Sequence, residues 1–516
     1  MAAMVLTSLA ANAQETYESA QLATEDLNGT ARYVGMGGAM EALGADISTM
    51  GTNPAGIGLF RRSWAGVSAG VTFQKQGFSN MGTNPIYDKD GITNADINQA
   101  GFVYATQVGS QSWFNLGVNF HKSRNFNMVA NAVNSLDGAS SLNKLSAMRL
   151  VQYNELCLLD QMNYNVINNR LSDVTDGVQT VGYSTANMYY GYNENNGYIG
   201  EYDINFSGNI YDKVYLGVSL GLKGVHYKKE TGYKEYLIDA ADMKRGEYVM
   251  ADDREVTGTG FDIKFGIIFR PVEDSPFRIG AYIHTPTWYD LTCNISMAVD
   301  AVYKYDGQDY NEKDSQGREY KYKITTPWKF GISFGHTINN MVALGATYEY
   351  ADYSFIKNKK VYDYDHSVFE RDYGMDANTD DCLRGVSTAK FGVEVKPVPE
   401  VAIRIGYNYV SPMYKKNASK DINVSPDPYY GSKGSYLSTY DYINWKDTHR
   451  VTFGLGFALT EKLNLDMAYQ FSTQKGDYHP FQSISIGEEE EGSNLGTVMS
   501  LKNNRHQLNF TLGYRF

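Results

Sequence analysis

The chain has 516 residues, a formal net charge of −12 and a negative mean hydropathy of −0.41. So acidic a chain lacks the basic face that nucleic-acid binding requires, which excludes a nucleic-acid partner. The 50 glycines and 42 tyrosines are typical of a protein of many strands and turns, and the lack of a run of about eighteen apolar residues excludes a helical membrane protein.

Residues 1–14 predict a signal peptide, shortened at its basic start. An apolar core from Met4 to Ala10 precedes Ala11-Asn12-Ala13, which is a small-x-small cleavage pattern. No cysteine stands directly after the cleavage point, which argues against a lipid-anchored N-terminus. An ordinary disordered start is the alternative.

Residues 15–62 differ from everything that follows them. From Gly29 to Leu59 the chain is apolar and rich in small residues, yet it does not alternate. Small residues permit close backbone approach, so a compact element is the natural form of this stretch. We expect it to fill the lumen of a barrel as a hatch, because the strands that follow carry small residues on one face.

Residues 63–516 predict an all-β fold, a transmembrane antiparallel β-barrel. Alternating segments of roughly ten residues, long enough to cross a bilayer at a tilt, recur about fourteen times. The last one, from His506 to Phe516, alternates without a break and ends on an aromatic residue. The first two begin near Ser63 and Gly101, and the others centre on Leu116, Asp203, Leu216, Ile263, Ile279, Ile332, Leu344, Val393, Ile403, Phe453, Leu465 and Phe510.

The connections alternate between short and long, as they do in outer-membrane barrels. The expected tight turns are Gly109-Ser110, Tyr211-Asp212, Pro271 to Pro276, Asn339-Asn340, Pro397 to Pro399 and Glu461-Lys462. The expected long loops are 75–98, 123–197, 228–256, 288–317, 354–383, 412–447 and 474–503. A soluble sandwich with one wet face would share the alternation but not the two classes of connection.

Charged residues within the strands share the face of the small residues. A charge facing lipid at mid-depth would cost about 2–4 kcal/mol, so these side chains are placed in the lumen. Four of them, Arg278, Lys390, Arg404 and Arg450, are candidates for pinning the hatch or for meeting a carboxylate head group.

The N-terminal motif resembles that of a known family. Ala31-Arg32-x-x-Gly35-Met36-Gly37-Gly38-Ala39, followed by Asp46 and by Asn53-Pro54-Ala55-Gly56, is similar to the hatch of FadL-type outer-membrane transporters of long-chain fatty acids and other hydrophobic compounds. The resemblance implies fourteen strands, loops that capture the ligand, and a hatch that shifts at Asn53 to Gly56 to open a path. Asn53 before proline is held extended and Gly56 allows a reversal, so the corner is stiff. A turn that never moves is the alternative.

A hydrophobic ligand would need a pocket, because the inward positions of the predicted strands are small or charged. The hatch supplies Met36, Met40, Leu43, Ile47, Met50 and Ile57. A helical insertion at about 139–172 in the second long loop supplies Leu145, Met148 and Met162. Helices that only cap the barrel are the alternative.

Other constellations carry little chemistry. Cys157, Cys293 and Cys382 allow one loop-to-loop disulfide and have no metal-ligand spacing, and no cofactor is predicted. Both Gly-x-Ser-x-Gly copies, at 66–70 and 217–221, lie inside strands rather than at a nucleophile turn, so an enzyme is not expected. The run Glu488 to Glu491 is a solvated loop or a cation bridge to lipopolysaccharide.

The predicted function is a monomeric channel in the outer membrane of a Gram-negative bacterium, surrounded by lipid and lipopolysaccharide, that passes a hydrophobic small molecule by passive diffusion. Three alternatives remain open, of which a barrel enzyme of the lipase or protease type is the least favoured, because no nucleophile constellation is present. A haem receptor would use an axial histidine such as His366 or His479, and a PorV-like protein would shuttle cargo in type IX secretion.

Overall fold

The computed structural model describes residues 15–76, 91–143, 172–175, 178–181, 185–238, 244–272, 274–305, 307–339, 341–362, 365–420, 438–483 and 494–516. Its helical elements are α1 (Thr16–Ala23), α2 (Ala31–Gly35), η1 (Ile47–Gly51), η2 (Pro54–Leu59), η3 (Ser141–Asn143), η5 (Tyr353–Phe355) and α6 (Tyr373–Cys382). In this described part of the chain, no helix is long and apolar enough to cross a membrane.

The strands form one large sheet and one small hairpin. They are β1 (Trp64–Gln76), β2 (Gly91–Gly109), β3 (Ser112–Asn125), β4 (Met128–Ser135), β5 (Ser172–Thr175), β6 (Val178–Val181), β7 (Thr185–Ile210), β8 (Val214–Ile238), β9 (Lys244–Phe269), β10 (Arg278–His284), β11 (Trp288–Tyr305), β12 (Gln308–Thr325), β13 (Lys329–Ile338), β14 (Val342–Asp352), β15 (Lys357–Tyr362), β16 (Asp365–Arg371), β17 (Gly385–Val398), β18 (Val401–Val410), β19 (Tyr442–Ala458), β20 (Leu463–His479) and β21 (Met499–Arg515).

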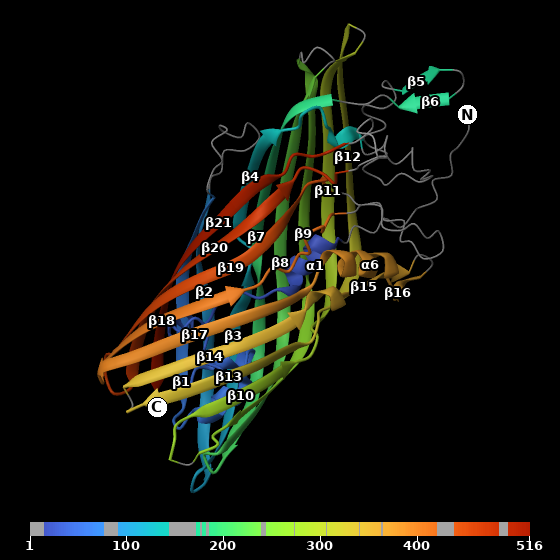
Figure 1. Cartoon of the computed structure of the whole chain (residues 1–516). Coiled ribbons are helices and arrows are strands. Elements are labelled where there is room, and N and C mark those ends of the chain that lie inside the picture. The colour runs from blue at the N-terminus through green and yellow to red at the C-terminus, as the bar shows by residue number, and fades with distance from the viewer. Residues whose placement is uncertain are drawn as a thin grey trace.

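Fourteen of these strands close into a barrel, and every pairing around it is antiparallel. The order is β1, β2, β3, β7, β8, β9, β10, β13, β14, β17, β18, β19, β20 and β21. β21 then pairs with β1, from Trp64 opposite Arg515 to Gln76 opposite Asn503. All fourteen predicted segments lie in these strands, so the predicted fold class is confirmed. Figure 1 shows the strands tilted around a common axis.

One end of the barrel carries the short turns and the other the long connections, and we name them the short-turn end and the long-loop end. At the short-turn end, Tyr211 and Asp212 adopt φ of 52° and 54°, and Asn339 adopts 50°. These left-handed conformations suit tight reversals between twisted strands. The predicted turns are confirmed where the structure describes their residues, which leaves out residues 273 and 340.

The outer surface next to the short-turn end is an apolar band. On β21, Leu508, Phe510, Leu512 and Tyr514 are all exposed, whereas their neighbours Asn509 and Thr511 are buried in the lumen. Trp288 and Trp328 are exposed at the border of the band that faces the long-loop end. An outward apolar band bordered by aromatic residues is the surface that a bilayer covers.

Towards the long-loop end the barrel wall continues, but the apolar side changes face. On β21, Met499 and Leu501 are buried inside while Ser500 and Lys502 are exposed, although the strand keeps the same register. β11 does the same, with seven buried side chains at alternate positions: Leu291, Cys293, Ile295, Met297, Val299, Ala301 and Tyr303. Outside the bilayer the surface meets water, so polar residues face out and an ordinary hydrophobic core forms inside.

This change of face overturns several predicted loops. Residues 228–256 belong mostly to β8 and β9, and residues 288–317 form the hairpin of β11 and β12. β2 begins at Gly91 rather than near Gly101, and β19, β20 and β21 also reach into the predicted loops 412–447 and 474–503. Cys293 on β11 and Cys382 on α6 are buried and are not bonded to each other, while Cys157 and Glu488 to Glu491 lie outside the described residues.

Residues 15–62, which we name the luminal segment, run through the barrel from the long-loop end to the short-turn end. Glu15 is held by Lys420, Lys229 and Arg254, whose strands or loops lie at the long-loop end. Near the other end, η2 contacts β7, β8 and β9. Helix α1 lies inside the barrel near the long-loop end in Figure 1.

Candidate functional site

A cavity of about 230 Å³ lies inside the barrel, between the luminal segment and the wall. Its lining includes six Lys and Arg side chains, namely Arg124, Lys329, Lys390, Lys446, Arg450 and Arg505. Only three carboxylates line it, those of Glu25, Asp26 and Glu349. The cavity is therefore cationic in a chain whose net charge is −12.

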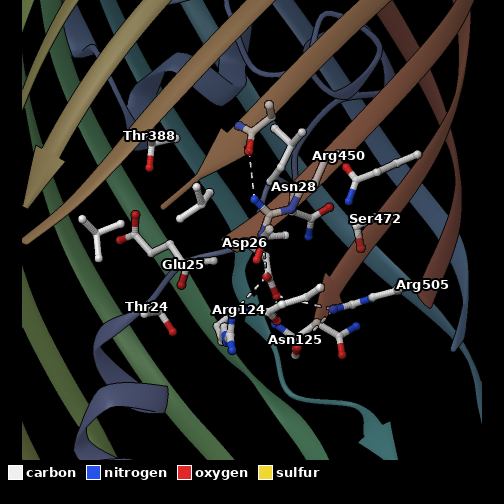
Figure 2. Close-up of a pocket in the computed structure, with 18 of the residues that line it drawn as sticks. Thr24, Glu25, Asp26, Asn28, Arg124, Asn125, Thr388, Arg450, Ser472 and Arg505 are labelled. Atoms are coloured by element: carbon white, nitrogen blue, oxygen red, sulfur yellow. Dashed lines mark hydrogen bonds and ion pairs between the residues drawn. The ribbon is translucent and has the colours of Figure 1, made fainter. Parts of the chain in front are cut away.

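The excess charge is concentrated around Asp26. Arg124 Nη1 lies 3.0 Å from Asp26 Oδ1, Arg505 Nη1 lies 3.6 Å from Oδ2, and Arg450 Nη2 lies 3.7 Å from Oδ1. Figure 2 shows these arginines around Asp26. One carboxylate cannot neutralise three guanidinium groups in a site shielded from water. The Nε atoms of Arg124 and Arg505 are buried without a hydrogen-bond partner among the described residues. This cluster can bind a further anion.

Apolar and aromatic side chains form another part of the lining. Val386, Val410 and Met413 come from the side of β17 and β18, and Phe126 and Tyr414 lie further towards the long-loop end. Tyr414 stacks on Tyr17 of α1 with ring centroids 5.0 Å apart. The cavity thus combines an anion-binding cluster with an apolar surface, as an amphiphilic ligand requires.

The predicted motif Asn53-Pro54-Ala55-Gly56 lies at the start of η2, against the wall of β7 to β9. Asn53 Oδ1 accepts from Ala55 N at 3.2 Å, and Asn53 Nδ2 donates to Glu41 O at 3.1 Å. A Cβ on Gly217 would clash with the backbone of Pro54, and one on Gly266 with Asn53 Oδ1. The corner is packed directly onto strand backbone.

Two predicted glycines of the luminal segment, Gly35 and Gly37, also sit where its backbone approaches the backbone of the wall closely. Gly37 and Gly38 adopt φ of 63° and 79°, and a Cβ on Gly37 would lie 2.8 Å from Tyr407 N. A Cβ on Gly35 would lie 3.0 Å from Gly454 Cα. At Gly35 and Gly37 a larger residue would fit only if the wall moved.

The six apolar residues predicted to bind ligand are all buried, in two small cores beside the wall. Met36, Met40 and Leu43 pack with Leu27 and Tyr33. Ile47, Met50 and Ile57 pack with Phe60 and Val103. None of the six lines the cationic cavity, and Ile47 lines a second cavity described below. Leu145, Met148 and Met162, together with most of the predicted helical insertion, lie outside the described residues.

The four predicted lumen charges all reach the luminal segment, directly or through one carboxylate. Lys390 Nζ lies 2.8 Å from Glu41 Oε1, and Arg278 Nη1 donates to Leu43 O at 3.1 Å. Arg404 Nε lies 2.6 Å from Glu394, which also binds Arg32 at 3.2 Å. Arg450 is the fourth and belongs to the Asp26 cluster.

Sequence reasoning missed Asp26, Arg124 and Arg505. Arg124 falls within a stretch predicted as a loop, and nothing local marks Asp26. Arg505 had a signal, because it continues the inward series of Gln507, Asn509 and Thr511 on β21.

His121, Glu201 and Asp203 are close enough together to hold a metal ion. The ammonium group of Lys264 already binds both carboxylates, with Nζ 3.1 Å from Asp203 Oδ1, so a cation is present there. His479, considered for haem, stacks flat on Tyr442 with centroids 4.6 Å apart, and the side chain of His366 lies outside the described residues.

A second cavity, of about 320 Å³, lies at the short-turn end beside β1, β20 and β21. Its lining includes Thr30, Asp46 and Ile47 of the luminal segment and Thr511 of β21. Arg62 and Arg515 line it near the turns. The cationic cavity therefore lies on the long-loop side of the middle of the luminal segment, and the second cavity lies on its short-turn side.

The chain is thus a closed barrel with an outward apolar band, and its lumen holds the luminal segment and the cavities beside it. No protein-family model and no curated protein matches the chain. Among solved structures, a Pseudomonas aeruginosa FadL homologue matches with a TM-score of 0.51 and 12% identity, over 96% of this chain and 100% of that chain.

Two further solved structures are similar over nearly their whole length. The CymD monoaromatic hydrocarbon channel matches at TM-score 0.49 and 10% identity, over 96% of this chain and 99% of that one. The P. putida toluene transporter TodX matches at 0.48 and 12%, over 95% and 99%. At these identities the likeness concerns the fold alone, and it is carried by the FadL homologue. The chain has the fold of FadL-type barrels.

Proposed function

We propose that this protein is an outer-membrane transporter for hydrophobic small molecules that carry an anionic head group, with long-chain fatty acids as the reference class. The observation that carries this proposal is the cationic, partly apolar cavity inside a transmembrane barrel. A carboxylate would sit against Arg124, Arg450 and Arg505, and its apolar body against Val386, Val410 and Met413.

The proposed route begins at the long-loop end and passes the luminal segment, which acts as the hatch. The ligand moves by passive diffusion, and no nucleotide or redox cofactor takes part. We propose that the protein is a monomer in the outer membrane of a Gram-negative bacterium, where lipid and lipopolysaccharide surround it. Residues 1–14 are removed as a signal peptide. The likeness in fold to a FadL homologue supports this location.

Binding of labelled oleate to the purified protein tests the proposal, with oleyl alcohol as the uncharged analogue. The double variant R450Q/R505Q should weaken oleate binding by roughly 10-fold or more, because each lost charged hydrogen bond is worth about 1.5–3 kcal/mol. Binding of oleyl alcohol should change little. The control R245Q removes an arginine that binds Lys304 O at the exposed surface.

Equal loss of oleate and oleyl alcohol binding would mean that the variant has damaged the cavity rather than an anion site. Absence of oleate binding by the parental protein would reject the proposed ligand class.

A further inference from the structure

Adjacent residues of the luminal segment line different cavities. Gly29 and Ser48 line the cationic cavity, whereas their chain neighbours Thr30 and Ile47 line the second cavity. At this part of the luminal segment, neighbouring residues of the chain therefore line one cavity each, and the chain lies between the two spaces. We name Gly29, Thr30 and Asp46 to Ser48 the partition.

Short hydrogen bonds between small side chains hold the partition together. Thr30 Oγ1 donates to Asp46 Oδ2 at 2.8 Å, and Ser48 N donates to Asp46 Oδ1 at 3.0 Å. Thr30 N donates to Ser48 Oγ at 2.9 Å. Asp46 therefore joins the two segments that form the partition.

The partition meets the wall of β2 and β21 through neutral groups. Ser48 Oγ donates to Gln99 Oε1 of β2 at 2.8 Å, and Ala31 N donates to Thr511 Oγ1 of β21 at 2.7 Å. Elsewhere the luminal segment is pinned to the wall by ion pairs, such as Lys390 with Glu41 and Lys223 with Glu25 at 3.0 Å. Neutral hydrogen bonds between small groups are easier to exchange than such charged pairs.

Two polar atoms beside this contact lack a partner. Asn509 Nδ2 on β21 and Gln470 Oε1 on β20 are buried without a hydrogen-bond partner among the described residues. Asn509 lies on β21 between Gln507, which lines the cationic cavity, and Thr511, which lines the second one. A passing polar head group or water would satisfy these atoms, which lowers the cost of opening here.

The opposite side of the luminal segment also has buried polar atoms without a partner among the described residues, Asn115 Oδ1 and Asn205 Oδ1, but there its backbone packs directly on the wall. The corner at Asn53 rests on glycine backbone of β8 and β9, as described above. Asn115 Nδ2 of β3 donates to Ile57 O at 2.6 Å, and Asn205 Nδ2 of β7 donates to Pro54 O at 3.4 Å. A ligand passing there would have to separate packed backbones.

We propose that the partition is the gate of the barrel, and that Asn53 to Gly56 is the fixed anchor beside which it opens. Exchange of the bonds made by Thr30, Asp46 and Ser48 joins the two cavities along the neutral side chains of β2, β20 and β21, which are Gln99, Gln470, Asn509 and Thr511. This inference rests on the proposed transport function, and it moves the gate away from the corner that the family resemblance implies.

The test locks each side of the luminal segment to the wall in turn. In a background of C157A/C293A/C382A, the pair S48C/Q99C is bridged by a short bifunctional thiol reagent with a reducible link. The matched control I57C/N115C is bridged in the same way on the anchored side. Uptake of labelled oleate is measured in cells that lack their own fatty-acid transporter, and oleate binding is measured on the purified proteins.

Bridging S48C/Q99C should reduce uptake to the level of cells without the protein, with full recovery of uptake on reduction. Bridging I57C/N115C should leave uptake unchanged. Parental uptake by bridged S48C/Q99C, or a block produced by the control pair, would overturn the gate.

Ion conductance in planar bilayers tests the gate without any assumed ligand. T30V/D46N should raise the conductance above that of the parental protein, and N205A, on the anchored side, should not. If the parental protein neither binds nor takes up oleate, the proposed ligand class is rejected. The conductance measurement then still tests whether the partition is the gate. Equal conductance of T30V/D46N and the parental protein would reject it.

Discussion

At the scale of single residues, charges inside the barrel fall into two groups. Lys223 and Lys264 share Glu201 and Asp262 at or near hydrogen-bonding distance, so their charges are balanced. Such buried pairs contribute little net stability, but loss of one partner leaves a charge uncompensated. The arginines around Asp26 are the second group, in which positive charge exceeds negative charge, and we propose that the anionic ligand binds there.

Glu15 belongs to the balanced group and lies outside the membrane-spanning part of the barrel. Burial alone would raise the pKa of its carboxyl group, but Lys420, Arg254 and Lys229 outweigh that effect, and the pKa lies well below its ordinary value of 4.5. A depressed carboxyl pKa stabilises the fold above pH 4.5, and this contribution is lost as the pH falls through the folded-state pKa.

We expect E15Q to lower the free energy of unfolding at pH 7 by about 3–5 kcal/mol, because three buried cations lose a shared carboxylate partner. The variant should also lose part of the decrease in melting temperature that the parental protein shows on acidification below pH 4.5. Thermal unfolding followed by circular dichroism in detergent measures both. E255Q removes an exposed partner of Lys228 and should change the stability by less than about 1 kcal/mol. Identical behaviour of E15Q and E255Q would contradict the role of Glu15.

At the scale of elements, η2 packs onto strand glycines without intervening side chains. This contact predicts that G217A on β8 destabilises the protein by about 1–3 kcal/mol, because the new methyl group meets the backbone of Pro54. G224A on the same strand is the matched control, since no atom lies within 4 Å of its Cβ position. A drop in melting temperature for both variants would point to the strand itself rather than to η2.

At the same scale, sequence patterns predicted the strands within the bilayer but not the hairpin of β11 and β12. Strands inside the bilayer were predicted because lipid demands an uninterrupted outward apolar series. The hairpin of β11 and β12 was predicted as a loop, because its exposed face carries residues such as Asp290, Lys313 and Lys323. In a strand exposed to water the apolar residues face the interior. In a strand exposed to lipid they face outwards, so the pattern of this hairpin is the reverse of the one that predicts a membrane-spanning strand.

At the scale of the whole molecule, the apolar band sets the position of the barrel in the bilayer. Trp288 and Trp328 are exposed at its border and should lie near the lipid head groups. In single-tryptophan variants, with the other tryptophans replaced by phenylalanine, lipids brominated near the head group should quench both more strongly than lipids brominated near the chain ends. Trp445, buried beside the cavity, is the unquenched control. Stronger quenching from the chain ends would mean that the band has been placed at the wrong depth.

The sequence by itself determined the number and order of the transmembrane strands, the position of the short turns and the inward placement of Lys390, Arg404 and Arg450. Each of these follows from the alternation of apolar and polar side chains along one strand, whose two faces meet lipid and the lumen. This pattern can be recognised in a single strand without knowledge of the others. Only the tertiary structure decided the site, because Asp26, Arg124, Arg450 and Arg505 meet across almost the whole length of the chain. Their contact depends on the closure of β21 onto β1 and on the path of the luminal segment between the two ends of the barrel, and neither leaves a periodic trace in the sequence.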